Sequence, residues 1–498
     1  MINIKLIQNN PYYIIEIILL VAGGLLPFSF APYEFFWLQY PLLALLFISV
    51  LNQSPKIAFL RGMVFSVAWF SHGIHWVFYS LHYHGGAPVF LAATMVVLLS
   101  LYLSLFPALA LSLSNRVIKN NALLLLVLVY PLSWMIFEWL RGYFLTGMPW
   151  LQLGVAHIDT YLSGFAPLVG GLGVGLLVTI VAGLLALMFN RQYMKLSGIS
   201  IVLIYLSGYL LSLINWTQPL GEPIKVSLIQ GNIPQSEKWR RELYAPTLQM
   251  YRQLTIENVD SDLIIWPETA VPGFKHRIDS YLNEISAQLI HTNTNVLLGV
   301  FERDEKTQRY FNSVINLDGQ SYKKRHLVPL GEYIPLRSLL SFFAQWINIP
   351  MSNIDNGELR QPLFEIAGQK IAVNICFEDV FDRDVLRDLP EANVLINVSN
   401  DAWFEDSTEP WQHHQIARMR AAETGRSLLR VTNTGVTSVI GEKGNVLAIL
   451  PQFKRDVLKY EVQGYSGATP YSVWKNYLLV MLGVAMLIYL RIKQHKKY

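Results

Sequence analysis

Long apolar segments separated by short polar breaks fill the first 214 residues of the chain. A helix that crosses a hydrocarbon core about 30 Å thick needs roughly 20 mostly apolar residues, and these segments are near that length. We therefore expect a polytopic membrane domain of α-helices, because a bilayer leaves the backbone polar groups of a spanning segment no other solvent. Eight spans are predicted: 12–30, 34–51, 57–79, 87–114, 122–140, 161–189, 196–214 and 474–490.

The composition agrees with a membrane protein. Hydrophobic residues make up 52% of the chain, charged residues only 15%, and the mean hydropathy is +0.33. A wholly soluble protein of ordinary composition is excluded by these values. The first apolar segment lacks both a strongly basic amino-terminal region and a small-residue cleavage site. We expect it to remain as a span rather than to be removed as a signal peptide.

Basic residues beside the spans predict the orientation. With a cytoplasmic amino terminus, the inner segments carry eleven basic residues and the short outer loops carry only Arg141, which is a strong positive-inside signal. The region 217–473 is then extracytoplasmic, and the formal net charge of +4 reflects topology rather than a nucleic-acid site. The inner basic residues are Lys5, Lys56, Arg61, Arg116, Lys119, Arg191, Lys195, Arg491, Lys493, Lys496 and Lys497.

The region 217–473 has the pattern of one α/β domain. Apolar, strand-like runs alternate with helical stretches, which predicts sheets covered by helices. We divide the chain into a membrane domain (1–216), a catalytic domain (217–473), and an eighth span with a basic tail (474–498). Strands are predicted at 226–230, 263–266, 296–301, 313–317, 371–376, 394–398, 428–432 and 436–440, and helices at 240–258, 279–291 and 412–425.

Cys376 is the only cysteine of the chain and ends the apolar run that begins at Lys370. A single cysteine excludes an intramolecular disulfide and a Cys-rich zinc site. The thiol is therefore either an inert buried group or a nucleophile. At the carboxyl end of a predicted strand, it lies where chemistry is possible.

Two more ionisable groups follow predicted strands in the same way. Glu268 lies in Trp266-Pro-Glu-Thr, and Lys324 lies in the basic run Lys323-Lys-Arg325. Taken singly, such residues are usually a solvated loop carboxylate and a surface basic run. Together with Cys376 they form a set for acyl transfer: the carboxylate takes the thiol proton, the thiolate attacks a carbonyl, and the lysine stabilises the oxyanion. This chemistry needs no cofactor, and none is expected.

Two further patterns have simpler interpretations. The glycine-rich run 170–175 resembles a dinucleotide-binding loop, but it lies inside a predicted span, so it favours close helix packing. His413 and His414 are adjacent and point to different faces of a helix, so we expect no metal site.

The order Glu268, Lys324, Cys376 resembles the Glu-Lys-Cys triad of the nitrilase superfamily. Longer motifs around these residues resemble the apolipoprotein N-acyltransferase family more closely, over nearly the whole chain, and such long motifs in order are highly specific. The matching stretches are Phe28–Pro32, Gly142–Trp150, Gln230–Ser236 with Lys238-Trp239, Trp266–Thr269, His326–Glu332, Ser399–Phe404, Pro410–His413 and Ala417–Ala421.

The resemblance implies an αββα sandwich and roles for single residues. Glu268 would be the general base, Lys324 the oxyanion stabiliser, and Cys376 the nucleophile that becomes a thioester. Lys324 is preferred to Lys323 because it lies two residues before His326, as in the family pattern. Supporting or substrate-binding residues would be Glu332, Glu378, Trp239, Asn312 and Phe377, the last of which stands where the family has an aromatic residue, often Tyr.

The resemblance also implies the reaction. A phospholipid would donate an acyl chain to Cys376, and the α-amine of the diacylglyceryl-cysteine of an apolipoprotein would accept it, at the periplasmic side of a bacterial inner membrane. Two alternatives remain at this stage: a membrane-anchored amidase with water as acceptor, and a transporter with a soluble sensor domain. The apolar stretch Leu336–Met351 is either an amphipathic lid at the membrane interface or an ordinary core helix.

Overall fold

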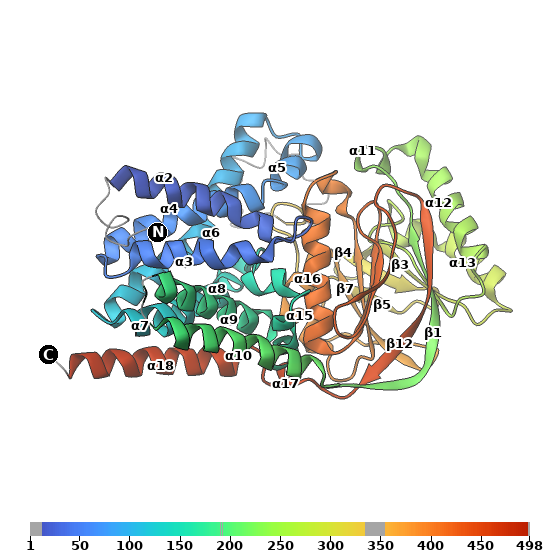
Figure 1. Cartoon of the computed structure of the whole chain (residues 1–498). Helices are drawn as coiled ribbons and strands as arrows, with labels where there is room; N and C mark the ends of the chain where they lie inside the picture. Colours follow the sequence, from blue (N-terminus) through green and yellow to red (C-terminus); the bar gives the residue numbers. More distant parts are fainter. Residues whose placement is uncertain (1–11, 190, 192, 334–353, 497–498) are drawn as a thin grey trace. The chain divides into compact units, whose positions relative to one another are not determined.

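The chain divides into two compact units in the computed structural model, which describes residues 12–189, 191, 193–333 and 354–496 (Figure 1). The first unit comprises the chain up to Trp76, Ala93–Asn215, and the chain from Val473 onward. The second comprises Val77–Ala92 and Trp216–Ser472. The stretch Leu336–Met351, for which the sequence leaves a lid or a core helix open, lies outside the described residues.

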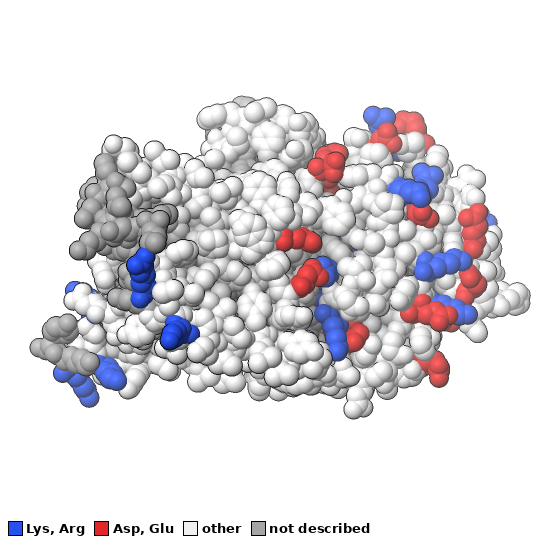
Figure 2. Space-filling view, in the orientation of Figure 1, with Lys and Arg blue, Asp and Glu red and all other residues white. Residues whose placement is uncertain are grey.

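The first unit is helical. Its two longest helices, α6 and α9, are apolar over enough of their length to cross a bilayer. Figure 2 shows few charged side chains along this unit and a group of Lys and Arg side chains at one end. The helices are α2 (Tyr12–Leu25), α3 (Gln39–Val50), α4 (Pro55–Gly73), α6 (Val89–Val117), α7 (Ala122–Leu124), α8 (Tyr130–Arg141), α9 (Ala166–Phe189), α10 (Met194–Ser212) and α18 (Tyr477–His495).

Each of the eight predicted spans contains helix, and the protein is a multi-pass membrane protein. Among the described residues, five helices are long and apolar enough to span, and a sixth candidate combines Pro55–Gly73 with Val77–His84. The two remaining apolar helices, Tyr13–Ser29 and Phe36–Val50, are shorter. The count of eight therefore stays a prediction.

Close backbone packing explains the glycine-rich run in the first unit. Gly154, in the short helix η6 (Leu153–His157), lies against α9 so closely that a Cβ there would be 2.0 Å from the carbonyl oxygen of Gly171. Any side chain at Gly154 would therefore push the two segments apart. The interpretation of this run as a helix-packing feature rather than a nucleotide-binding loop is confirmed.

Two six-stranded sheets form the frame of the second unit. The order is β12-β1-β2-β3-β4-β5 in one sheet and β11-β10-β9-β8-β7-β6 in the other, with β1–β2–β3 and β7–β8–β9 parallel. The strands are β1 (Gln218–Gln230), β2 (Leu263–Ile265), β3 (Asn295–Arg303), β4 (Tyr310–Asn316), β5 (Ser321–Lys323), β6 (Phe364–Ile366), β7 (Gln369–Ile375), β8 (Val394–Ser399), β9 (Ser427–Thr432), β10 (Ser438–Ile440), β11 (Val446–Ile449) and β12 (Asp456–Ser466).

The two sheets pack face to face, and helices cover their outer faces. Val226, Leu228 and Val314 of one sheet join Val373 and Ile396 of the other in a single buried core. Figure 1 shows α12 and α13 over the first sheet and α16 over the second. The fold is an αββα sandwich, as expected. Its helices are α11 (Gln235–Lys238), α12 (Arg241–Ile256), α13 (Asp279–Leu289), α15 (Asp382–Val385), α16 (Glu409–Thr424) and α17 (Pro470–Trp474), with the short α5 (Val77–Tyr79) from the earlier segment.

All eight predicted strands exist, and four others were not predicted. β5 and β6 have only three residues each, and β11 and β12 are partly exposed, so none forms a long apolar run. The parallel strands β2, β7 and β8 end at Ile265, Ile375 and Ser399, so Glu268 and Cys376 follow the ends of β2 and β7. Within each sheet, the carboxyl ends of parallel strands lie at one edge. The hydrogen bond from the Asn400 N–H, after β8, to Glu268, after β2, shows that these edges of the two sheets meet.

Candidate active site

Cys376 occupies a strained turn at the end of β7. Its φ of 51° lies in the left-handed region, which a residue with a side chain rarely adopts and which often marks functional sites. The amide Nδ2 of Asn397, on the neighbouring strand β8, donates to the carbonyl oxygen of Cys376 at 3.0 Å. Arg430 Nη1 donates to Asn397 Oδ1 at 2.6 Å and so holds that amide. The turn is therefore fixed by a hydrogen-bonded chain beneath it.

A pocket of about 140 Å³ brings the predicted catalytic residues together within the second unit. Glu268, Lys324 and Cys376 all line it, with Glu332, Trp239 and Asn312 of the supporting set. Apolar and aromatic side chains complete the wall. They include Leu81, Phe301, Val328, Leu330, Ile354, Trp403 and Phe404.

Lys324 lies between two carboxylates. Its Nζ is 3.4 Å from Glu268 Oε1 and 2.9 Å from Glu332 Oε2, and the lysine side chain is 1% exposed. Asn312 Nδ2 donates to both carboxylates, at 2.8 Å to Glu268 and 2.9 Å to Glu332. The second oxygen of Glu268 accepts from the backbone N–H of Asn400 at 2.9 Å. Base and cation are thus held in fixed positions.

The charges around the thiol set its resting state. Burial raises the pKa of Cys376 well above its usual value, the Glu268 carboxylate raises it further, and Lys324 opposes both. Burial lowers the pKa of Lys324, but the charges of Glu332, Glu268 and Cys376 more than offset this and raise it above its ordinary value. At neutral pH the site therefore holds a protonated thiol beside a permanent ammonium ion, and the thiol needs a base before it can attack.

Lys323 and Lys324 have different surroundings. Lys323 does not line the pocket, and its Nζ lies over the ring of Phe311, 4.3 Å from the centroid. Lys323 ends β5, whereas Lys324 follows the strand and lines the pocket, with its Nζ between Glu268 and Glu332. The geometry supports Lys324 as the candidate oxyanion stabiliser.

Glu378 and Phe377 lie outside the lining of the pocket. The buried Glu378 carboxylate accepts from the backbone N–H groups of Arg325 (2.6 Å), His326 (3.1 Å) and Ile375 (2.7 Å), and from the hydroxyl of Tyr322 (2.8 Å). It thereby ties the residue before Cys376 to the residues after Lys324. The ring of Phe377 packs edge-on against Phe381, at 4.9 Å between centroids.

The chain is similar to known proteins over nearly its full length. The family described as apolipoprotein N-acyltransferase N-terminal domain matches residues 22–184, and the carbon-nitrogen hydrolase family matches residues 225–471. A protein named apolipoprotein N-acyltransferase from Methylococcus capsulatus is 43% identical over 463 residues, which are 92% of each chain. The chain belongs to the apolipoprotein N-acyltransferase family.

Other members of the apolipoprotein N-acyltransferase family agree. The Nitrosomonas europaea protein is 39% identical over 92% of this chain and 93% of its own, and the Vibrio cholerae protein is 38% identical over 91% and 92%. Among solved structures, a CN-hydrolase superfamily protein from Xanthomonas campestris matches with a TM-score of 0.37 and 20% identity, over 52% of this chain and 97% of that chain.

Several residues of this family member's pocket had no role in the sequence analysis. Lys238 and Trp403 lie in motifs that carry the family resemblance, but their place in the wall emerges only from the fold. Residues 80–85 also reach the pocket, and His84 Nε2 lies 2.8 Å from Glu405 Oε1. No sequence signal connects that segment with the sandwich, because about 130 residues separate it from β1.

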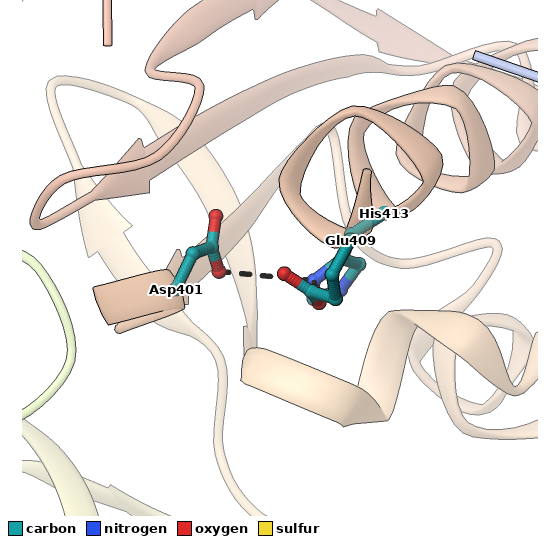
Figure 3. Close-up of side chains that lie close together, drawn as sticks. All are labelled: Asp401, Glu409 and His413. Atoms are coloured by element: carbon teal, nitrogen blue, oxygen red, sulfur yellow. Dashed lines mark ion pairs between the residues drawn. The ribbon is translucent and has the colours of Figure 1, made fainter. Parts of the chain in front are cut away.

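Asp401, Glu409 and His413 belong to a cluster of buried charged residues (Figure 3). His413, on α16, lies between carboxylates, with Nε2 2.7 Å from Asp379 Oδ1 and Nδ1 3.3 Å from Glu409 Oε1. Asp401 accepts from Arg430 Nη2 at 3.1 Å and from the Ser399 hydroxyl at 2.5 Å. The Ser399 hydroxyl also lowers the pKa of the Cys376 thiol, against the larger effect of burial. The cluster thus connects with the candidate nucleophile.

Asp401, Glu409 and His413 offer ligand atoms within 4.8 Å of one another, the spacing of a metal site. Burial and Arg430 lower the pKa of His413, but Asp379 and Glu409 more than offset this and raise it to about 9. A protonated imidazole has no lone pair for a metal. The Arg430 guanidinium already supplies positive charge to Asp401. These residues therefore fit an ion-pair network better than a metal centre.

Proposed function

We propose that the protein is a phospholipid:apolipoprotein N-acyltransferase. It moves a fatty acyl chain from a phospholipid, through a thioester on Cys376, to the α-amine of the diacylglyceryl-cysteine of an apolipoprotein. The observation that carries the proposal is the convergence of Cys376, Glu268 and Lys324 in one pocket with apolar walls. The names of the relatives support the acyltransferase reaction, and the apolar helices fit substrates that stay in a bilayer.

In the first half-reaction, Glu268 takes the proton of the Cys376 thiol as the sulfur attacks an ester carbonyl of the phospholipid. Lys324 stabilises the negative charge that forms on the carbonyl oxygen. The tetrahedral intermediate then breaks its bond to the glycerol oxygen, which takes the proton from Glu268. The products are the Cys376 thioester and a lysophospholipid.

In the second half-reaction, the neutral α-amine of the acceptor attacks the thioester carbonyl. Glu268 takes a proton from the amine nitrogen and returns it to the sulfur as the C–S bond breaks. An amide and the free Cys376 thiol result, so the sequence is ping-pong. Glu332 and Asn312 support the proposal because they fix Lys324 and Glu268.

Mass analysis tests the proposed function directly. Purified protein mixed with phospholipid should gain one acyl mass on the peptide that contains Cys376, and a diacylated lipopeptide with a free α-amine should remove it as an amide. Release of free fatty acid without amide would instead indicate the amidase-like use of water. No adduct and unchanged lipids would contradict the enzymatic proposal and favour the transporter alternative.

Lys324 and Lys323 provide a matched pair of substitutions. Lys324→Ala should lower the rate of acyl-enzyme formation by roughly 10² to 10³, the scale of one lost oxyanion donor. Lys323→Ala should change it less than twofold, because that ammonium lies over Phe311 outside the pocket. Single-turnover acylation measures both rates. A large effect of Lys323→Ala with a silent Lys324→Ala would reverse the assignment.

We further propose that the catalytic domain (217–473) faces the periplasm from the bacterial inner membrane, that residues 1–216 form the membrane domain, and that 474–498 form an eighth span and a basic cytoplasmic tail. The distribution of basic residues supports this orientation. In a Cys376→Ala background, Lys306→Cys should react with a membrane-impermeant thiol reagent in spheroplasts, and His495→Cys should not. Both positions are exposed. The opposite labelling pattern would place the pocket in the cytoplasm.

A further inference from the structure

Lys238 is a second ammonium ion in the pocket, and the mechanism above does not use it. It ends the short helix α11, is only 3% exposed, and lines the pocket with Glu268 and Cys376. Its Nζ donates to the backbone carbonyl oxygen of Glu268 at 3.3 Å. A lysine this buried is unusual, because removing an ammonium ion from water costs several kcal/mol unless a partner replaces the water.

The two lysines of the pocket differ in their partners. Lys324 contacts the carboxylates of Glu268 and Glu332, which occupy two of its three N–H donors and leave one for the oxyanion. Across the described ranges, the Glu268 carbonyl is the one hydrogen-bond acceptor recorded for Lys238 Nζ, and no carboxylate lies within salt-bridge distance of it. An ammonium group has three N–H donors. Two donors of Lys238 therefore remain for a ligand.

The electrostatics of the pocket favour Lys238 as the point where an anion binds. Near Lys324, an anionic ligand would meet two carboxylates that already share its charge. Lys238 offers a positive charge that no carboxylate of the described residues contacts. Burial lowers the pKa of Lys238 to about 8, and the charge of Glu268 opposes this shift. An anion at its Nζ would stabilise the charged form and remove part of the desolvation penalty.

We propose that Lys238 binds the phosphate of the phospholipid donor. This inference rests on the proposed function and adds the recognition of one substrate. The phosphate is the one anionic group that every phospholipid carries close to its glycerol esters. The proposed acceptor instead presents an amine to the site. Lys238 therefore acts in the first half-reaction, where it aligns the ester that Cys376 attacks.

The test compares a donor that carries a phosphate-containing head group with one that lacks it. Acylation of Cys376 is measured in nonionic detergent with dipalmitoyl phosphatidylglycerol and with dipalmitoylglycerol, which is neutral. Hydrogen bonds to charged groups contribute about 1.5–3 kcal/mol, so Lys238→Met should lower the phosphatidylglycerol-to-dipalmitoylglycerol rate ratio by roughly tenfold to a hundredfold. Lys238→Arg should retain most of the ratio, and Lys323→Met, outside the pocket, is the matched control and should not change it.

Several outcomes would overturn the inference. If Lys238→Met lowers the acylation rate equally with both donors, Lys238 acts through Glu268 or through folding and not through the phosphate. A lower melting temperature would indicate folding, and an unchanged one would indicate Glu268. An unchanged ratio would exclude phosphate binding, and if acyl adducts still form the proposed function stands. Inhibition of the dipalmitoylglycerol reaction by inorganic phosphate, without any change of donor ratio, would assign the site to a free anion instead of a lipid.

Discussion

Replacement of Cys376 by serine or by alanine is expected to abolish acyl transfer completely. Alanine removes the nucleophile, and a serine hydroxyl is far harder to ionise than a thiol. Burial and the Glu268 carboxylate already raise the pKa of the thiol at this position. They would oppose the ionisation of a serine hydroxyl there in the same way. Neither the acyl adduct at residue 376 nor the amide product should appear by mass analysis, and the loss should exceed that of any other single substitution in the pocket.

The melting temperature in detergent is the control for this prediction. The Cys376 side chain is partly exposed at the pocket, so neither replacement leaves a large internal cavity. Both variants should unfold within a few degrees of the wild-type protein. Amide formation by either variant at wild-type expression would contradict the assignment of Cys376 as nucleophile.

The sequence predicts the sandwich well where its strands are buried on both faces. β7, β8 and β9 have six or seven residues each, are rich in Val, Ile and Leu and are buried except for Lys370, and all three were predicted. Glu268 and Cys376 follow parallel strands of different sheets, so strand direction places each at the carboxyl edge of its own sheet. Their meeting also needs the packing of the two sheets against each other. Lys324 needed the family resemblance as well, because the sequence alone offers three adjacent basic residues.

The remaining parts of the site depend on contacts between distant segments. Asn397 lies within an apolar strand and shows no sequence sign that it holds the Cys376 carbonyl. Lys238 looks like one more basic residue of a polar stretch until α11 brings it to Glu268. For Glu378, the family resemblance implied a place in the pocket. The structure instead turns its carboxylate toward backbone N–H groups, an orientation that residue type and spacing do not encode.

Glu378→Gln is expected to lower stability and activity together. All four partners of the carboxylate are donors, and an amide NH2 group must face at least one of the pairs Arg325/His326 and Ile375/Tyr322. A buried polar group left without a partner costs about 1–3 kcal/mol. We expect the free energy of unfolding to fall by about 2–5 kcal/mol, which a lower melting temperature would reveal.

Activity should fall further than stability explains, because Glu378 joins the turn of Cys376 to the segment of Lys324. A displacement of about 1 Å between reacting groups costs on the order of 10²-fold in rate, so single-turnover acylation of still-folded Glu378→Gln should be slower by that factor. The matched control is Glu365→Gln on β6, where the side chain is exposed and away from the pocket. It should alter neither quantity. A Glu378→Gln variant with lower stability but a normal acylation rate would show that Glu378 supports the fold without positioning the two catalytic groups.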